Sequence, residues 1–231
     1  MNAYNLSALG AGERRFVPAS SVDVKEALKN CEAFATWAKR NNYKALVFPL
    51  AAFDSRKTLG KLKQLKQLTL EYGITLEAGG WDLSSLVPRR YFFLHKESFR
   101  MEGGRRKKDH HFCPTSLETI KIIGKEGAKI FKTAAGIEIF HLWPDKGAES
   151  LWCSCPTCRA FSFQEQARIA VNAAADVLAT INPSASITCF EKSFEKSLEA
   201  CKISLRKNII KLDSLCIENL DKVREPFNSC C

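Results

Sequence analysis

The stretch from Gly136 to Cys158, GIEIFHLWPDKGAESLWCSCPTC, constrains the fold of this chain more than any other. It begins as a short apolar run and breaks at Trp143-Pro144-Asp145. It then passes through a cluster of cysteines before a helical pattern starts at Ser162. A strand, a loop and a helix in this order form the βα unit of an α/β protein. Because functional side chains in such folds gather in the loops that follow the strands, this loop is the first candidate site.

Similar units occur on both sides of this stretch. Apolar residues recur at helical spacing in four segments, residues 24–40, 57–72, 115–132 and 162–181. Short apolar runs predict strands at residues 45–50, 74–78, 137–142 and 186–190, with a short first strand at 14–17 as one interpretation of an ambiguous segment. Strands that alternate with helices predict a parallel sheet.

The ends of two helices have local signals, because Thr115 with Glu118 and Ser162 with Glu165 match the Ser/Thr-x-x-Glu capping box. After Glu191 a stripe of leucines in a segment of mixed charge predicts a C-terminal helix. Since one parallel βα unit uses roughly 30 residues or more, the 40 residues after Glu191 are too few to complete a barrel.

The predicted fold is therefore α/β, a partial (truncated) TIM-type (β/α) barrel with parallel strands and a C-terminal helix. Residues 1–190 would form the partial barrel and residues 191–231 a helical tail.

The composition is that of a soluble globular protein, with 45% hydrophobic and 26% charged residues in 231 positions, enough for a substantial core. No stretch approaches the roughly 18 apolar residues of a membrane span. The first residues contain no apolar core of signal-peptide length. We therefore predict a cytoplasmic protein without a membrane partner, provided that the N-terminus is not truncated. The oligomeric state stays open.

The net charge of +10 is concentrated in one segment, Arg89–Lys108, which has eight basic residues and the two acids Glu97 and Glu102, and therefore carries +6. Such a segment can bind phosphate, uronate carboxylates or RNA, or can simply be solvated. Aromatic residues lie between the basic ones, as in a groove for single-stranded nucleic acid. However, the sequence contains no recognisable RNA or DNA motif, so a nucleic-acid partner is the weaker interpretation.

Three carboxylates follow predicted strands: Asp82, Asp145 and Glu191. In a parallel sheet they would project from one edge, where paired carboxylates can cleave a glycosidic bond. Pro-Asp-Lys-Gly is also a favourable β-turn, so Asp145 has a purely structural alternative, and Glu191 can be a solvent-facing strand end.

Three tryptophans, Trp81, Trp143 and Trp152, lie near these acids in the sequence. Flat rings at the mouth of a pocket can stack on sugars, and the alternative for each ring is core packing.

The cysteines indicate a second kind of site. Cys153, Cys155 and Cys158 form a Cys-x-Cys-x-x-Cys sequence, and a fourth ligand could come from Cys113, His110, His111 or His141. Tetrahedral zinc takes three or four such ligands, and zinc here would tie the loop rather than catalyse. Absence of a metal is the alternative, because ten cysteines without a signal peptide also suit reduced thiols. The sequence contains no GxGxxG, P-loop, nucleophile-elbow or HExxH motif.

Several segments in the same order resemble a known family. They are RYFFLHKESFRMEGGRR, HFCPTSLETI, LWPDKG followed by WCSCPTC, and VNAAADVLATINPSASITCF. Together, over about residues 14–190, they resemble a domain-of-unknown-function family of glycoside-hydrolase-like (β/α)8 barrels. That family is similar to alpha-glucuronidases and beta-hexosaminidases. This sequence departs from the family pattern at Lys96, where a proline is usual, and at Phe190, where a tyrosine is usual.

The resemblance implies a carbohydrate-active protein, an O-glycosyl hydrolase if it is an enzyme, that acts on or binds a uronic-acid or hexosamine sugar. Asp145 would be one acid/base carboxylate and Glu191 or Asp82 the other. Arg105 or Arg106 would bind a uronate carboxylate. The residues expected to bind the sugar are Trp81, His95, Glu97, Arg105, Arg106, His141, Trp143 and Trp152.

Two other functions remain open. One is a non-catalytic or degenerate binding module whose cysteine loop is tied by zinc through Cys153, Cys155, Cys158 and Cys113. The weaker one is nucleic-acid binding through residues 89–108. Glycosidic cleavage requires no cofactor, so a structural zinc is the only cofactor that we expect.

Overall fold

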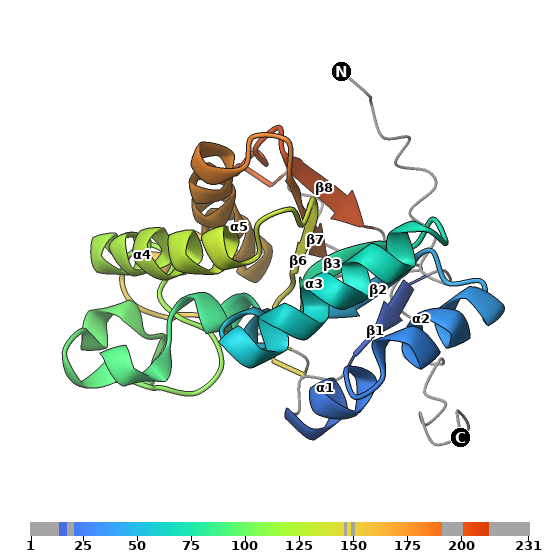
Figure 1. The fold of residues 1–231 in the computed structure, drawn as a ribbon. Coiled ribbons are helices and arrows are strands. Elements are labelled where there is room, and N and C mark those ends of the chain that lie inside the picture. Colours follow the sequence, from blue (N-terminus) through green and yellow to red (C-terminus); the bar gives the residue numbers. More distant parts are fainter. Residues whose placement is uncertain (1–13, 18–20, 146, 149–150, 191–200, 213–231) are drawn as a thin grey trace. The chain divides into compact units, whose positions relative to one another are not determined.

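The structure is a computed structural model that describes residues 14–17, 21–145, 147–148, 151–190 and 201–212 (Figure 1). The chain divides into two compact units. Unit 1 consists of Met1–Gly80 and Leu212–Cys231, and unit 2 of Trp81–Lys211. Glu191 and most of the predicted helical tail lie outside the described residues.

Unit 1 contains three parallel strands in the order β1, β2, β3, together with their helices. Its elements are β1 (Arg14–Phe16), α1 (Ser21–Ala27), α2 (Cys31–Arg40), β2 (Ala45–Phe48), the 3₁₀ helix η3 (Leu50–Phe53), α3 (Arg56–Leu70) and β3 (Thr75–Gly80). All four residues of β2 are buried, as expected for a central parallel strand that is covered on both faces. The predicted strands and the helix at 57–72 are confirmed, with shifted ends.

The prediction of one helix over residues 24–40 is wrong, because the structure has two helices there. Asn30 caps the second one, since its side-chain oxygen accepts a hydrogen bond from the backbone nitrogen of Ala33 at 3.1 Å. A side chain that satisfies a free N–H group at a helix start favours an interruption where the apolar spacing alone predicts continuity.

A buried ion pair links the first and third strands of unit 1. The Arg14 guanidinium donates two hydrogen bonds to the Glu77 carboxylate, at 2.9 and 3.1 Å. The Glu77 side chain is only 1% exposed and that of Arg14 is 11% exposed. Two charges in such a setting are stable only as a pair, because either one alone would lose its hydration without compensation.

Unit 2 contains the rest of the described chain. Its strands are β6 (Ile139–Leu142), β7 (Ser186–Phe190) and β8 (Ile209–Leu212), in that order, and a separate hairpin is formed by β4 (Met101–Glu102) and β5 (Arg105–Arg106). Its helices are α4 (Leu117–Thr133) and α5 (Phe163–Ile181), which pack against each other (Figure 1), and the 3₁₀ helices η4 (Leu83–Leu86), η5 (Arg89–Phe93), η6 (Lys96–Ser98) and η7 (Cys158–Ala160). Strands β6 and β7 are parallel, with Phe140 beside Ile187.

The two predicted capping boxes have different outcomes. The box of Ser162 and Glu165 is present at the start of α5. At α4 the cap is Ser116 rather than Thr115, because the Ser116 hydroxyl accepts from the Thr119 backbone nitrogen. The Thr115 hydroxyl lies 3.1 Å from the sulfur of Cys158 instead.

The predicted C-terminal helix is wrong for residues 201–212, which form a loop and the strand β8. The β-branched residues Ile209 and Ile210 favour a strand. The segment is also held at the sheet, since the backbone nitrogen of Ile187 donates to the carbonyl of Asn208 at 2.9 Å. Sheet pairing therefore overrides the helical spacing of the leucines.

The class of the fold is α/β with mostly parallel strands, as predicted. The described strands of neither unit close into a barrel. Among the helices of the described residues, none combines the length and the hydropathy needed to cross a membrane.

Replacement of Glu77 by glutamine should lower the free energy of unfolding by about 3–5 kcal/mol, because it leaves the Arg14 charge buried and unpaired. Urea denaturation followed by circular dichroism measures the change. Glu71→Gln, at an exposed position just after α3, is the control and should stay within about 0.5 kcal/mol of wild type. Equal stability of the two variants would contradict a stabilising role of the pair.

Candidate functional site

Four cysteine side chains meet in unit 2. Cys113, Cys153, Cys155 and Cys158 are all buried, and their four sulfur atoms lie within 4.8 Å of one another. The sulfur of Cys113 lies 3.8 Å from that of Cys155 and 3.6 Å from that of Cys158. The cluster can therefore offer four ligand atoms to one metal ion.

These separations fit a metal site better than a disulfide. A disulfide needs two sulfurs at roughly 2.0 Å. Ligands about 2.3 Å from a tetrahedral ion are about 3.8 Å apart along each edge of the tetrahedron. Cys113 and its two measured neighbours have almost this spacing. The geometry thus approximates the coordination shell of a tetrahedral ion.

Short backbone contacts bring the two cysteine-bearing segments together. The Ser154 backbone nitrogen donates to the carbonyl of Met101 at 2.8 Å, beside the Met101 backbone nitrogen, which donates to the Cys153 sulfur at 3.3 Å. The Cys113 backbone nitrogen donates to the carbonyl of Ser98 at 2.9 Å. The β4–β5 hairpin between these contacts turns at Gly103-Gly104, where both φ angles are positive, as a two-residue hairpin turn requires.

Gln166, in the first turns of α5, holds the cysteine loop from the other side. It is only 2% exposed, and its amide nitrogen donates to the carbonyls of Cys153, Cys158 and Phe161 at 3.2–3.3 Å. Its amide oxygen accepts from the Cys153 backbone nitrogen at 3.1 Å. One side chain therefore lies within hydrogen-bond distance of four backbone groups of the loop that carries three of the sulfurs, with its two N–H hydrogens shared among three carbonyls.

The thiols also influence one another's ionisation. Hydrogen bonds from Cys153 and Cys158 lower the pKa of Cys113, so this sulfur ionises first. The same shared protons raise the pKa of Cys158, and they raise that of Cys153 to about 11. Without a cation, Cys153 and Cys158 therefore keep their protons. A divalent cation can replace them, because its charge stabilises the thiolates.

A second group of polar atoms lies close to the four cysteines in the sequence. Within the described structure, Arg89 Nη1, His111 Nδ1 and Asp145 Oδ1 are buried and have no hydrogen-bond partner. The Arg89 and Asp145 side chains form an ion pair at 4.0 Å between Nη2 and Oδ2, and Arg89 Nη2 also donates to the carbonyl of His110. Since buried polar groups are nearly always paired, three unpaired atoms on interacting residues mark an unusual place.

The charges of this group act on each other. Burial lowers the pKa of His111, and the nearby Asp145 carboxylate opposes that shift. Burial likewise lowers the pKa of Arg89. His111 Nε2 lies 2.9 Å from the carbonyl of Ala148, which can only accept, so Nε2 carries the proton. In the neutral ring Nδ1 is then the unprotonated nitrogen.

The ring of His111 also connects this group to the cysteines. It stacks on Trp152, with ring centroids 4.3 Å apart and planes 15° from parallel. His111 is two residues before Cys113, and Trp152 is directly before Cys153. Both residues of the stack are therefore close in sequence to cysteines of the cluster.

Asp145 lies beside Arg89 and also begins a turn. In this turn the Ala148 backbone nitrogen donates to the Asp145 carbonyl at 3.0 Å. The loop of Asp82 meets the same region, since the Leu83 backbone nitrogen donates to the carbonyl of Trp143 at 3.1 Å. Trp81 contacts Trp143 edge to face, with centroids 5.4 Å apart. The structure therefore brings the two loops together, and Glu191 lies outside the described residues.

Two of the three tryptophans are core residues. Trp143 is 1% exposed and Trp152 is 4% exposed. The indole nitrogen of Trp143 donates to the Thr188 hydroxyl at 3.1 Å, and His141 Nδ1 lies 2.7 Å from the same hydroxyl. His141 is itself buried. These rings pack inside unit 2, and only Trp81 is partly exposed.

The remaining residues expected to bind a sugar are spread over the hairpin region. His95 Nδ1 lies 3.5 Å from Glu118 and 3.8 Å from Glu97, and Glu97 is exposed. Arg105 is exposed at the end of the hairpin turn, whereas Arg106 contacts the Cys153 sulfur at 3.7 Å. The two arginines thus have different surroundings.

Half of the eight basic residues at 89–108 have internal partners. Arg90 binds Glu126 at 2.7 Å, and Arg100 binds Asp109 through two hydrogen bonds, at 2.8 and 2.9 Å. Arg89 and Arg106 take part in the two groups described above. The other four, Lys96, Arg105, Lys107 and Lys108, are exposed, and so is Arg90. Much of the positive charge in this segment therefore holds its own fold.

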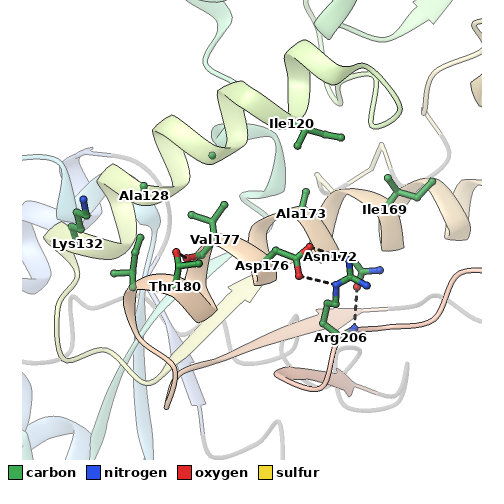
Figure 2. Close-up of a pocket in the computed structure, with 12 residues that line it drawn as sticks. Ile120, Ala128, Lys132, Ile169, Asn172, Ala173, Asp176, Val177, Thr180 and Arg206 are labelled. Carbon is green, nitrogen blue, oxygen red and sulfur yellow. Dashed lines mark hydrogen bonds and ion pairs between the residues drawn. The ribbon is translucent and has the colours of Figure 1, made fainter.

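Figure 2 shows a groove of about 770 Å³ between α4 and α5, lined by apolar side chains such as Ile120 and Val177. Its polar groups already bind each other, because Arg206 contacts Asp176 at 2.7 Å and donates its backbone N–H to the Asn172 side chain at 3.1 Å. None of the residues predicted to bind sugar or metal lines this groove. We therefore place the functional site at the cysteines and not here.

Sequence reasoning missed Arg89, Thr115 and Gln166 as members of these groups. Arg89 was visible only as part of a basic run, and Thr115 only as a helix cap. For Gln166 no sequence signal exists, since a buried glutamine on a helix has no characteristic pattern. By contrast, the Cys-x-Cys-x-x-Cys spacing did predict the position of the cluster.

Gln166→Leu should lower the free energy of unfolding of unit 2 by at least about 2 kcal/mol, because it leaves buried backbone groups of the cysteine loop without hydrogen-bond partners. Thermal denaturation measures the change in stability, and elemental analysis measures the change in metal content. Gln64→Leu, at an exposed position of α3, is the control. Unchanged stability and metal content in Gln166→Leu would show that the loop does not depend on this side chain.

No protein-family model matches the sequence, and no curated protein matches it. Among solved structures, the chain is similar to a family 1 β-glucosidase from Thermotoga maritima, at 15% identity and a TM-score of 0.39. The match covers 75% of this chain, which spans 39% of the length of that structure.

Proposed function

We propose that this chain is a zinc-binding α/β domain in which one Zn²⁺ joins the segment before α4 to the loop after β6. The observation that carries the proposal is the convergence of four buried cysteine sulfurs within 4.8 Å. Four cysteine ligands in a tetrahedral arrangement are typical of structural zinc, and such sites add directly to the stability of a fold.

The type of ligand favours zinc over harder cations. Thiolates are soft donors that select zinc or iron–sulfur centres, whereas magnesium and calcium require oxygen ligands. The site also has four protein ligands, which leaves no open position for a water or substrate. A closed shell of this kind supports a structural role rather than a catalytic one.

Purified protein should contain about one zinc per chain, and Cys155→Ser should lose most of it and melt at a lower temperature. Elemental analysis and a thermal denaturation curve are sufficient measurements. Cys201→Ser, at a half-buried cysteine outside the cluster, should keep both properties. Wild-type protein that is purified without zinc, takes up none when zinc is added, and melts at the same temperature as Cys155→Ser would end the proposal.

A second candidate function is carbohydrate binding or cleavage, with Asp145 as one acid/base carboxylate and Asp82 or Glu191 as the other. The observation that favours it is the buried Asp145 oxygen without a hydrogen-bond partner, beside Arg89 and His111. Buried polar groups without a hydrogen-bond partner lower the stability of a protein, and active sites commonly contain such groups. The partly exposed Trp81 and the loop of Asp82 lie in the same region.

For this second function, wild-type protein should release sugar from uronic-acid or hexosamine oligosaccharides, and Asp145→Asn should be slower by roughly 100-fold or more. Reducing-end assays on a panel of such substrates measure the rate. Asp176→Asn, which alters a surface ion pair, is the control. Folded wild-type protein that releases no sugar from the panel would leave the domain as a zinc-stabilised, non-catalytic module.

A further inference from the structure

We propose that Arg106 compensates the charge of the metal centre and thereby sets its affinity for zinc. The inference rests on the proposed zinc function and concerns the same site. It assigns to one arginine of the Arg105-Arg106 pair a role in the metal centre, while the other stays in solvent.

The hairpin gives the two arginines opposite surroundings. Both are on β5, where successive side chains point to opposite faces. Arg105 is exposed and is paired with Glu102 in the strand register. Arg106 is half-buried, and its Nη1 donates to the carbonyl of Phe99 at 2.6 Å and to the Cys153 sulfur at 3.7 Å. The second contact makes Arg106 a neighbour of the metal ligands.

The charge of a four-thiolate site explains why such a neighbour matters. Four thiolates and one Zn²⁺ carry a net charge of −2, and the four cysteine residues here are 0–4% exposed. In a poorly hydrated site this charge is costly, and a nearby cation acts more strongly there than in water. Arg106 reduces the net charge to −1 and interacts electrostatically with Cys113, Cys153 and Cys155.

Neutral donors complete the shell around the sulfurs. The Met101 backbone nitrogen donates to Cys153 at 3.3 Å, and the Thr115 hydroxyl lies 3.1 Å from Cys158. Such outer groups orient metal ligands and tune their basicity, and their loss costs about 10–100-fold in metal affinity. Among these three donors Arg106 alone brings a full charge, so its removal should have the largest effect.

The metal-free protein separates this role from simple packing. In the metal-free protein Arg106 has no zinc–thiolate shell beside it, whereas its hydrogen bond to the Phe99 carbonyl is still present. If Arg106 acts on the metal site, its loss should lower the melting temperature of the zinc-bound protein and hardly change that of the chelator-treated protein. If its bond to Phe99 is what matters, both forms should lose stability equally.

The experiment compares Arg106→Leu, Arg106→Lys and the matched control Arg105→Leu. Competition with a chromophoric chelator gives the dissociation constant for zinc, and the absorption bands of the cobalt-substituted protein report whether four thiolates still bind. Arg106→Leu should bind zinc about 10–100-fold more weakly with the four-thiolate spectrum retained. Arg106→Lys should recover most of the affinity, and Arg105→Leu should match wild type.

The outcomes separate the inference from the function on which it rests. Wild-type protein that binds no zinc or cobalt would overturn both. Wild-type protein that binds zinc, with Arg106→Leu unchanged in affinity, would overturn only the role of Arg106. Equal loss of affinity in Arg105→Leu and Arg106→Leu would also overturn it, because a general effect of positive charge on the hairpin would then suffice.

Discussion

The convergence of four buried thiols is the interaction on which the irregular half of unit 2 depends. Residues 98–113 and 151–161 form little regular structure, so few backbone ladders hold them. Cross-links between such segments stabilise a fold chiefly by restricting the unfolded chain, and the benefit grows with the length of the closed loop. A metal bound by Cys113 and Cys158 would close a loop of more than forty residues. Gln166 then fixes the position of this loop on α5.

The same constraint reaches the polar group around Asp145. His111 and Trp152 are neighbours in sequence of Cys113 and Cys153, and their rings stack at 4.3 Å. Contacts that fix the cysteines therefore also fix the His111 imidazole, which interacts electrostatically with Asp145. Asp145, His111 and Arg89 each have one buried atom without a hydrogen-bond partner, and such an arrangement needs a rigid frame, because in a flexible one these atoms would rearrange and pair. A metal bound by the four cysteines, as proposed, would supply that frame.

The fold and the site could be predicted from the sequence only where the signal was local. The capping box of Ser162 was visible because both partners lie within four residues. The predicted cap at Thr115 is wrong because the Thr115 hydroxyl contacts the sulfur of Cys158 instead. Cys158 is 43 residues away in the sequence, so no local pattern contains this contact. The strand β8 was missed because sheet pairing, not the leucine spacing, decides its conformation.

The charge of the chain shows the same limit in another form. As a sequence, Arg89–Lys108 is a basic run that favours an anionic partner. In the structure, arginines of this run are bound to Glu126 and Asp109, and another contacts the Cys153 sulfur. Arginine suits such internal roles, because its planar group can bind two acceptors at once while staying charged. A count of charges cannot separate these arginines from the exposed lysines, whereas the partners of each guanidinium can. Much of the positive charge in this segment is therefore the counterpart of carboxylates and of a cysteine sulfur within unit 2.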